Sequence, residues 1–316
     1  MMEKRELGST GIQVSPLCLG GNVFGWTIDE PQSHLILSAA VDAGLNFIDT
    51  ADVYSAWAHG GEGGQSETII GSWLKKTGSR NKVIIATKVG KDMGNGKKGL
   101  SKAYITKAVE DSLRRLQTDY IDLYQSHDDD QQTPFEETLA AFGELIKQGK
   151  VRAIGASNYN AQRLQESLDV SKKNNLPAYQ TLQPLYNLYD REAYEKELEA
   201  VCVANGLGVL NFYALASGFL TGKYRTEEDL AKTRRQSNKK YFNERGFKIL
   251  KGLDEVAARY GANPAQVALA WQMDRPSITS PIASATSIDQ LQDLIKATEL
   301  KLDANAMTVI DRASAW

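Results

Sequence analysis

The sequence predicts an α/β fold in which parallel strands close into a barrel. Short segments rich in β-branched and apolar residues alternate with amphipathic helical segments along nearly all of the 316 residues. No low-complexity tract or proline-rich linker divides the chain, so we expect one domain over residues 1–316. Eight strands that alternate with helices are typical of a (β/α)8 TIM barrel. An open, doubly wound parallel sheet is the alternative that this pattern alone leaves open.

The order of the elements begins with a hairpin-like stretch, in which residues 5–7 and 12–14 flank a turn-forming segment at 8–11. The eight predicted strands of the barrel are residues 17–19, 46–49, 83–87, 121–125, 153–156, 181–183, 209–212 and 278–281. Six of the helical segments between them are residues 34–43, 65–76, 102–116, 135–148, 161–174 and 194–204.

Capping residues support these helices. Ser101 can accept a hydrogen bond from the first turn of the helix that follows it, and Pro134 stands at a favourable position for a helix start. Glycines lie where four helices should end, at Gly44, Gly78, Gly149 and Gly206.

One connection is longer than the others. Residues 218–245, after the seventh strand, are polar and rich in cations, and long loops in barrels are usually functional. The cations are Lys223, Arg225, Arg234, Arg235, Lys239 and Lys240.

The composition limits the function classes. The chain is 42% hydrophobic and 24% charged with a net charge of -2, so we expect no attraction to nucleic acids or anionic membranes from its overall charge. No apolar run is long enough to cross a membrane, and residues 1–10 do not resemble a signal peptide. Cys18 and Cys202 lie in apolar stretches as buried thiols, which favours a reducing, cytoplasmic location. The three histidines lack the spacing of metal ligands.

Chemically active side chains gather at the carboxyl ends of the predicted strands, where barrels carry their active sites. Asp49 and Tyr54 follow the second strand, Lys88 the third and His127 the fourth. Each alone is more often a surface or structural residue. Four polar groups that apolar strands direct toward one rim are costly to bury unless they pair with one another.

Asp49, Tyr54, Lys88 and His127, placed together, can transfer a proton to or from a substrate. A nearby Lys ammonium should favour the phenolate of Tyr54 and lower its pKa from about 10. Asp49 can hold Lys88 charged, and His127 can orient the reacting oxygen. A phenol placed in this way can protonate an alkoxide as hydride arrives, or deprotonate an alcohol in the reverse direction.

Six segments in order along nearly the whole chain resemble the aldo-keto reductase family, and the bacterial and potassium-channel β-subunit-like members in particular. The resemblance implies the catalytic roles of Asp49, Tyr54, Lys88 and His127, and a barrel whose bottom is closed by the N-terminal hairpin. The six segments are residues 46–54, 86–88, 119–127, 149–158, 183–187 and 215–224.

The resemblance further implies NADP(H) bound without a Rossmann fold, and no G-x-G-x-x-G fingerprint opens a βαβ unit here. Ser157, Asn158 and Gln183 are expected to contact the carboxamide, and Phe212 to stack on the nicotinamide. The other expected cofactor contacts are Gly21, Asn22, Tyr213, Leu215, Ser217, Lys223, Arg234, Ser284, Thr286 and Gln290.

Three departures from the family pattern have consequences. Tyr213 replaces a small serine, which narrows the pocket. Asp128 begins a run of three aspartates where an aromatic residue or arginine is common. Ser284, Thr286 and Gln290 are neutral where basic residues often hold the adenosine phosphate, so we expect a reduced preference for NADPH over NADH.

The expected function is therefore NADPH-dependent reduction of an aldehyde or ketone, with a small carbonyl compound as substrate. An NAD-linked enzyme that oxidises alcohols is one alternative, and a cofactor-binding regulatory subunit is the other. A metal hydrolase is disfavoured, because the strand ends lack a His/carboxylate ligand cluster. Phe24, Trp26 and Trp57 are candidates for lining the substrate pocket.

Overall fold

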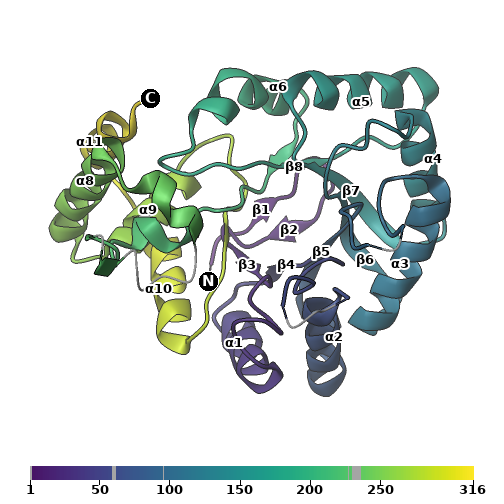
Figure 1. The fold of residues 1–316 in the computed structure, drawn as a ribbon, viewed down its shortest axis with the longest axis horizontal. Helices are drawn as coiled ribbons and strands as arrows, with labels where there is room; N and C mark the ends of the chain where they lie inside the picture. The colour runs from purple at the N-terminus through teal and green to yellow at the C-terminus, as the bar shows by residue number, and fades with distance from the viewer. Residues whose placement is uncertain (1, 59–61, 95, 227, 230–235) are drawn as a thin grey trace.

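The computed structural model describes residues 2–58, 62–94, 96–226, 228–229 and 236–316. Eight parallel strands form one curled sheet in the order β10-β3-β4-β5-β6-β7-β8-β9, with helices on its outer side (Figure 1). The strands are β3 (Cys18–Gly20), β4 (Phe47–Asp49), β5 (Ile84–Val89), β6 (Ile121–Ser126), β7 (Val151–Ser157), β8 (Thr181–Gln183), β9 (Gly208–Val209) and β10 (Ile282–Ala283).

Backbone hydrogen bonds close this sheet into a barrel. The Ile282 N–H donates to the Asn211 carbonyl at 2.9 Å, and the Thr279 N–H donates to the Val209 carbonyl at 2.9 Å. These bonds join the two ends of the strand order, which confirms the (β/α)8 barrel and excludes the open, doubly wound sheet.

The last strand was predicted too early. Residues 278–281 lead into β10, whose parallel pairing with β3 begins at Ile282. Pro281 has no N–H to donate to a ladder, although its carbonyl accepts from Cys18 N at 3.0 Å. The strand therefore starts one residue after the proline.

The N-terminal hairpin consists of β1 (Arg5–Glu6) and β2 (Gln13–Val14), which pair antiparallel. Leu7, Ile12 and Val14 are buried in a cluster with residues of five barrel strands, among them Cys18 and Phe47 at the start of β3 and β4. The hairpin thus closes the amino-terminal end of the barrel, as predicted, and leaves the carboxyl ends of the strands open.

The helices follow the predicted positions closely. Ser101 accepts from Tyr104 N and caps α3, and Ser287 accepts from Gln290 N and caps α10. Residues 194–204 form a single helical run that begins as a π-helix, η2 (Tyr194–Leu198). The α-helices are α1 (Glu30–Asp42), α2 (Gln65–Thr77), α3 (Lys102–Leu116), α4 (Phe135–Lys147), α5 (Ala161–Asn174), α6 (Glu199–Ala204), α8 (Glu244–Tyr260), α9 (Pro264–Met273), α10 (Ile288–Glu299) and α11 (Ala304–Ser314).

The long connection after β9 contains short 3-10 helices, namely η3 (Ala216–Thr221) and η4 (Gln236–Tyr241), and another, η1 (Arg80–Lys82), precedes β5. Arg234, predicted as a cofactor contact, and Arg235 beside it lie outside the described residues.

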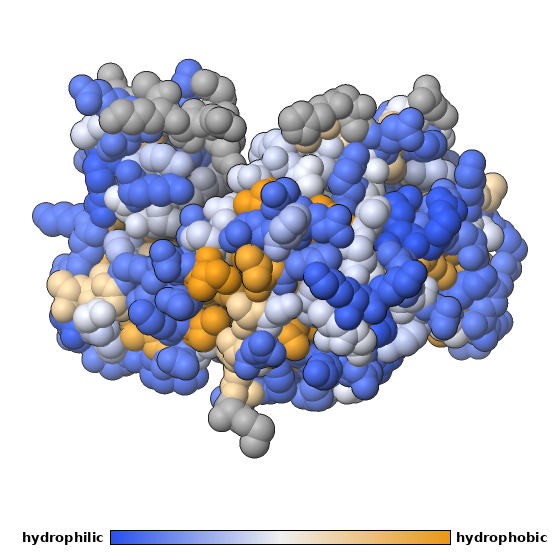
Figure 2. All heavy atoms as spheres, turned by 90° about the horizontal axis from the view of Figure 1, so that it is seen from below, coloured by the Kyte–Doolittle hydropathy of each residue, from blue (hydrophilic) through white to orange (hydrophobic). Residues whose placement is uncertain are grey.

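The surface seen from below is mainly hydrophilic, with a small group of hydrophobic side chains near its middle (Figure 2). Within the described ranges, every helix is too short or too polar to pass through a bilayer. Cys18 and Cys202 are both buried free thiols.

Candidate active site

The four predicted side chains meet at the open, carboxyl end of the barrel. Asp49 is the last residue of β4, Lys88 lies in β5 and His127 directly follows β6. Lys88 Nζ donates to Tyr54 Oη at 2.8 Å, and the rings of Tyr54 and His127 lie edge-to-face with centroids 6.1 Å apart. The tertiary structure thus brings together residues that are up to 78 positions apart in the chain, the span from Asp49 to His127.

Lys88 is the centre of this group. Its ammonium donates to Asp49 Oδ2 at 2.6 Å and to the Thr50 carbonyl at 2.8 Å, in addition to Tyr54. The Lys88 side chain is fully buried, and burial lowers its pKa while Asp49 opposes that shift. A buried ammonium with three acceptors is held in one position, which fixes its distance to the phenol.

The second carboxylate oxygen of Asp49, Oδ1, also accepts hydrogen bonds. Gln183 Nε2 donates to Asp49 Oδ1 at 2.9 Å, and Gln125 Nε2 lies 3.5 Å from the same oxygen. The carboxylate is therefore compensated by one cation and two amides although it is buried. Gln125 was not predicted as a site residue, although its position two residues before His127 was an available signal.

The pKa of Tyr54 moves opposite to the predicted direction. Burial raises it well above 10, and the negative charge and hydrogen bond of Asp49 raise it further. Lys88 was expected to lower this pKa, but Asp49 lies beside both groups and offsets the ammonium charge. Tyr54 consequently keeps its proton at neutral pH, which suits a proton donor.

His127 is nearly buried, and burial together with the charges of Lys88 and Lys91 lowers its pKa well below 6.5. The imidazole is therefore neutral at physiological pH. A neutral imidazole carries one N–H, which can donate to a carbonyl oxygen, and adds no positive charge next to Lys88.

Ser157, Asn158 and Gln183 also lie together, at the ends of β7 and β8. Ser157 Oγ donates to the Gln183 carbonyl at 3.0 Å, and Asn158 Nδ2 donates to the His127 carbonyl at 2.9 Å. The amide nitrogens of Asn158 and Gln183 thus already serve protein acceptors. Their amide oxygens are the atoms that can accept from the N–H groups of a carboxamide, which fits the predicted contacts.

The loop after β9, where the pyrophosphate was predicted to bind, has an unusual backbone. Ala216, Ser217 and Gly218 have φ angles of 49°, 55° and 90°, so three successive residues are left-handed. Lys223 Nζ approaches this turn closely enough that a Cβ on Gly218 would lie 3.4 Å from it. Leu215 begins this turn, since its carbonyl accepts from Gly218 N at 2.8 Å.

The remaining predicted contacts surround the ends of β3 and β10. Gly21 admits no side chain, because a Cβ would lie 2.9 Å from Ser66 Oγ and 3.0 Å from the Asp49 carbonyl. Ser284 Oγ donates to Asn22 Oδ1 at 2.5 Å. Thr286 donates to Gln290 Oε1 from both its N–H, at 2.9 Å, and its hydroxyl, at 3.0 Å. Thr286 and Gln290 are uncharged and lie at the amino end of α10, where the helix dipole and free N–H groups favour an anion.

Asp52 is a second group that the sequence argument missed, although it lies within the segment 46–54. Both carboxyl oxygens are buried without a hydrogen-bond partner among the residues that the structure describes. Burial and the charge of Glu67 raise the pKa of Asp52 to about 8, against the opposing charge of Arg115. Asp52 is thus mainly protonated at pH 7, two residues before Tyr54 in the chain.

Two of the three predicted pocket residues lie at the site. Trp57 packs edge-to-face on Tyr54 with centroids 6.0 Å apart, and Trp26 packs edge-to-face on Trp57 at 5.5 Å. Trp26 is 38% and Trp57 51% exposed, so both present apolar surface beside the phenol. Phe24 is fully buried in the main core and was wrongly expected in the pocket.

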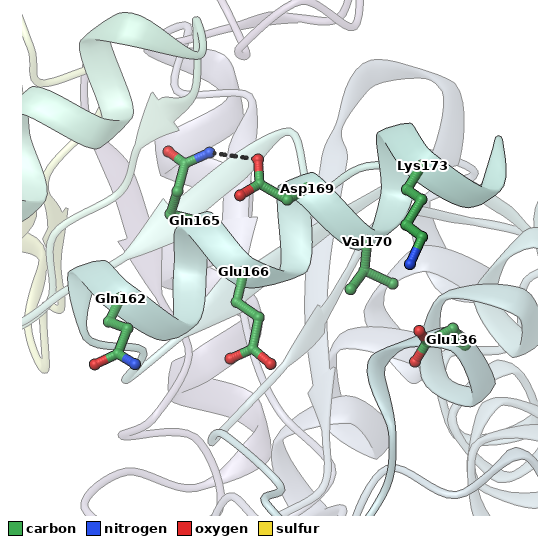
Figure 3. Close-up of a pocket in the computed structure, with 7 residues that line it drawn as sticks. All are labelled: Glu136, Gln162, Gln165, Glu166, Asp169, Val170 and Lys173. Carbon is green, nitrogen blue, oxygen red and sulfur yellow. Dashed lines mark hydrogen bonds between the residues drawn. The ribbon is translucent and has the colours of Figure 1, made fainter.

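A separate shallow depression lies on the outer surface of the barrel, between α4 and α5 (Figure 3). It contains carboxylates, amides and one lysine, and Gln165 Nε2 donates to Asp169 Oδ1 at 2.9 Å within it. Its lining residues are Glu136, Gln162, Gln165, Glu166, Asp169, Val170 and Lys173. None of the predicted catalytic or cofactor-binding residues lines it.

Comparison with known proteins agrees with this geometry. Residues 16–315 match the model of the aldo/keto reductase family. The chain is 37% identical to the uncharacterized oxidoreductase YrpG of Bacillus subtilis, over 98% of this chain and 95% of that protein. It is 34% identical to the protein tas of Escherichia coli, over 98% and 97% of the two chains. It is also 34% identical to a probable voltage-gated potassium channel subunit beta of Oryza sativa subsp. japonica, over 95% and 92%. The chain therefore belongs to the aldo/keto reductase family and is an NAD(P)H-dependent oxidoreductase.

Proposed function

We propose that this protein reduces the carbonyl group of an aldehyde or ketone with NADPH, and that Tyr54 is the proton donor. The observation that carries the proposal is the position of Lys88 Nζ, which lies 2.8 Å from Tyr54 Oη and 2.6 Å from Asp49 Oδ2. A partly buried phenol in direct contact with a buried ammonium and carboxylate forms an acid–base unit at the open end of the barrel.

The cofactor would be held along the strand ends. Ser157, Asn158 and Gln183 would bind its carboxamide, and Phe212 would support the nicotinamide ring. The turn at 215–218 with Lys223 would bind the pyrophosphate, and Ser284, Thr286 and Gln290 would bind the adenosine phosphate. When bound, the reduced nicotinamide supplies the hydride.

The residues of the chain then supply the proton and the orientation. The substrate oxygen would lie between Tyr54 Oη and His127, so that both can donate to it. As hydride adds to the carbonyl carbon, the oxygen gains negative charge, and Tyr54 transfers its hydroxyl proton to that oxygen. Lys88, 2.8 Å away, stabilises the phenolate that remains until solvent returns a proton.

The raised pKa of Tyr54 is consistent with a proton donor, because a phenol that keeps its proton at neutral pH can donate it to an alkoxide. The same phenol can accept the proton in the reverse direction, so turnover measurements separate the reductase from the NAD-linked dehydrogenase.

The test is turnover of a panel of aldehydes and ketones with NADPH and with NADH, followed by the absorbance of the reduced nicotinamide. We expect NADPH oxidation that depends on a carbonyl compound and is lost in Tyr54→Phe. Oxidation of alcohols with NAD⁺ at a higher kcat/KM than any carbonyl reduction would instead support the dehydrogenase.

A second candidate is a cofactor-binding regulatory subunit, because the chain is similar to a probable channel subunit beta over 95% of its length. The two functions separate in one experiment. Tight NADPH binding without turnover of any carbonyl compound in the panel would favour the regulatory subunit over the reductase.

A further inference from the structure

The loop that follows β8 contains an asparagine that reaches the cofactor side of the site. Asn187 is fully buried, and its Nδ2 donates to the carbonyl of Tyr213 at 3.1 Å. Tyr213 follows Phe212, on which the nicotinamide is proposed to stack. Electrostatic interaction with the Tyr213 phenol is one of the smaller causes that raise the pKa of Tyr54, so the two side chains lie near each other.

The backbone conformation of Tyr213 requires stabilising contacts from other residues. Its φ angle is 56°, a left-handed conformation that is unfavourable for a residue with a bulky side chain. The ring cannot supply that support alone, because it is 49% exposed and contacts Phe212 only at a tilt of 55°, with centroids 5.4 Å apart. What holds the residue is its carbonyl, which accepts from Asn187 and from Ala216 N at 2.7 Å.

The Asn187 amide can act in this way because its own orientation is fixed. Its Oδ1 accepts from Tyr189 N at 2.8 Å and from Asp190 N at 3.0 Å. Its Nδ2 also donates to Asp190 Oδ2 at 3.1 Å. With two donors facing the oxygen and two acceptors facing the nitrogen, a rotated amide would lose all four contacts.

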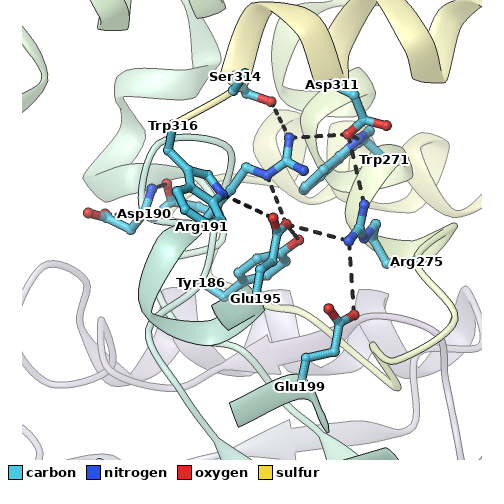
Figure 4. Close-up of polar contacts among 12 residues, drawn as sticks. Tyr186, Asp190, Arg191, Glu195, Glu199, Trp271, Arg275, Asp311, Ser314 and Trp316 are labelled. Atoms are coloured by element: carbon cyan, nitrogen blue, oxygen red, sulfur yellow. Dashed lines mark hydrogen bonds and ion pairs between the residues drawn. The ribbon is translucent and has the colours of Figure 1, made fainter. Parts of the chain in front are cut away.

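Asp190 connects this amide to η4, in the long connection that follows β9. Tyr241 Oη donates to Asp190 Oδ2 at 3.0 Å, and Lys240 Nζ lies 3.0 Å from Asp190 Oδ1. The next residue faces the other way: Arg191 donates to Glu195 Oε1 at 2.8 Å and to Ser314 Oγ at 2.7 Å (Figure 4). Figure 4 shows Asp190 pointing away from this ion-pair network. The network joins the loop to α11 through Ser314, whereas Asp190 contacts Asn187 and η4.

We propose that Asn187 is a positioning residue of the cofactor site: by holding the Tyr213 carbonyl it fixes the Phe212–Tyr213 pair against which the nicotinamide ring binds. The proposal rests on the proposed function, since it assumes that NADPH binds along β9. Asn187 touches neither the substrate nor the reacting atoms.

The test is a double-mutant cycle on NADPH affinity, measured by calorimetry with the full chain. Asn187→Ala should weaken NADPH binding about five- to tenfold, as expected for one lost hydrogen bond. In a Tyr213→Gly background the same change should cost less than twofold, because glycine adopts a positive φ without help. An equal loss in both backgrounds would mean that Asn187 only stabilises its own loop, and would overturn the proposal.

A fragment of the cofactor gives a second readout. Adenosine 2′,5′-bisphosphate lacks the nicotinamide, so Asn187→Ala should leave its affinity unchanged. A parallel loss for the fragment and for NADPH would contradict the positioning role. Asn205→Ala, at the exposed asparagine that follows the last residue of α6, is the matched control and should change neither affinity.

If Asn187→Ala does not fold, the exchange Asn187→Asp/Asp190→Asn replaces it. The exchange keeps an oxygen for the N–H groups of Tyr189 and Asp190 and keeps a donor–acceptor pair between the two side chains. It removes the donor to Tyr213, so the same loss of NADPH affinity is expected, and unchanged affinity would refute the proposal. Absence of NADPH binding by the wild-type chain would overturn both this inference and the proposed function, whereas equal losses in both backgrounds would overturn the inference alone.

Discussion

Lys88 Nζ donates to Tyr54 Oη at 2.8 Å and, at 2.6 Å, to Asp49 Oδ2, with the Thr50 carbonyl as its third acceptor. The ammonium is thus shared between the Asp49 carboxylate and a phenol that keeps its proton. Burial is the largest cause that raises the pKa of Tyr54, and the charge and hydrogen bond of Asp49 add to it, so contact with the lysine does not lower this pKa. The sharing of the ammonium makes separate predictions for the three residues.

Tyr54→Phe should abolish most of the turnover, because it keeps the ring and removes the proton. We expect kcat to fall by about 10² to 10⁴, the usual contribution of general acid catalysis. NADPH affinity should change less than twofold, which calorimetry can measure alongside stopped-flow or steady-state rates. A variant with near wild-type kcat would show that another group donates the proton.

Lys88→Met should reduce both stability and turnover, because it leaves the buried Asp49 carboxylate without its cation. Removing one partner of a buried ion pair costs about 3–5 kcal/mol in the free energy of unfolding. Adding Asp49→Asn should restore part of that stability without restoring kcat. Denaturant unfolding and steady-state rates on the three variants separate the two effects, and turnover that recovers together with stability would contradict a catalytic role for Lys88.

Asp52→Asn should stabilise the protein at high pH. The pKa of Asp52 is about 8 in the folded chain and 3.8 as its ordinary value, so between these limits the folded state holds a proton that the unfolded state has lost. Wild-type stability from this group is therefore fully present below pH 4 and is lost as pH rises toward 8, at up to about 1.4 kcal/mol per pH unit.

The measurement for Asp52 is the difference in unfolding free energy between Asp52→Asn and wild type from pH 4 to pH 9. The difference should grow with pH in favour of the variant and level off above pH 8. Asp52→Ala adds a pH-independent packing loss but should show the same slope. A difference that does not vary with pH would mean that Asp52 is ionised in the folded protein.

Trp57→Ala should weaken the binding of aromatic carbonyl substrates more than that of small aliphatic ones. Trp57 exposes half of its side chain beside Tyr54, so an aromatic substrate can pack on it, and such contacts contribute about 0.5–1.5 kcal/mol. We expect KM to rise roughly two- to tenfold for an aromatic aldehyde and to stay constant for a short aliphatic aldehyde. Equal effects on both substrates would place Trp57 outside the substrate pocket.

Gln290→Arg should strengthen the preference for NADPH. Gln290 lies with Thr286 at the amino end of α10, and an arginine there can hold the 2′-phosphate with two charged hydrogen bonds. The NADPH/NADH ratio of kcat/KM should rise about tenfold at low salt and fall as salt is added. Gln165→Arg, on the outer face of α5, is the control and should leave the ratio unchanged.

The sequence by itself predicted the alternating parallel strands and helices and the main polar groups at the strand ends, and hydrogen bonds between the first and last strands of the sheet order then established that the sheet is closed. Helices α3 and α5 have the predicted bounds, because their amphipathic pattern is bounded by local signals such as the Ser101 cap and the Asn175 backbone in the left-handed region. Asp49, Tyr54, Lys88 and His127 could be assigned to one rim because successive parallel strands must end on the same side.

Only the tertiary structure decided the pKa values, burial and hydrogen bonds of the residues at the carboxyl ends of the strands. The pKa of Tyr54 depends on the relative distances of Asp49 and Lys88, and no spacing along the chain contains those distances. The burial of Phe24, and of an Asp52 carboxyl that has no hydrogen-bond partner among the described residues, depends in the same way on packing between segments. The support of Tyr213 by Asn187 joins two loops 26 positions apart, so it exists only once β8 and β9 lie side by side. Local sequence sets backbone conformation and periodicity, whereas burial and charge proximity arise only when distant segments pack together.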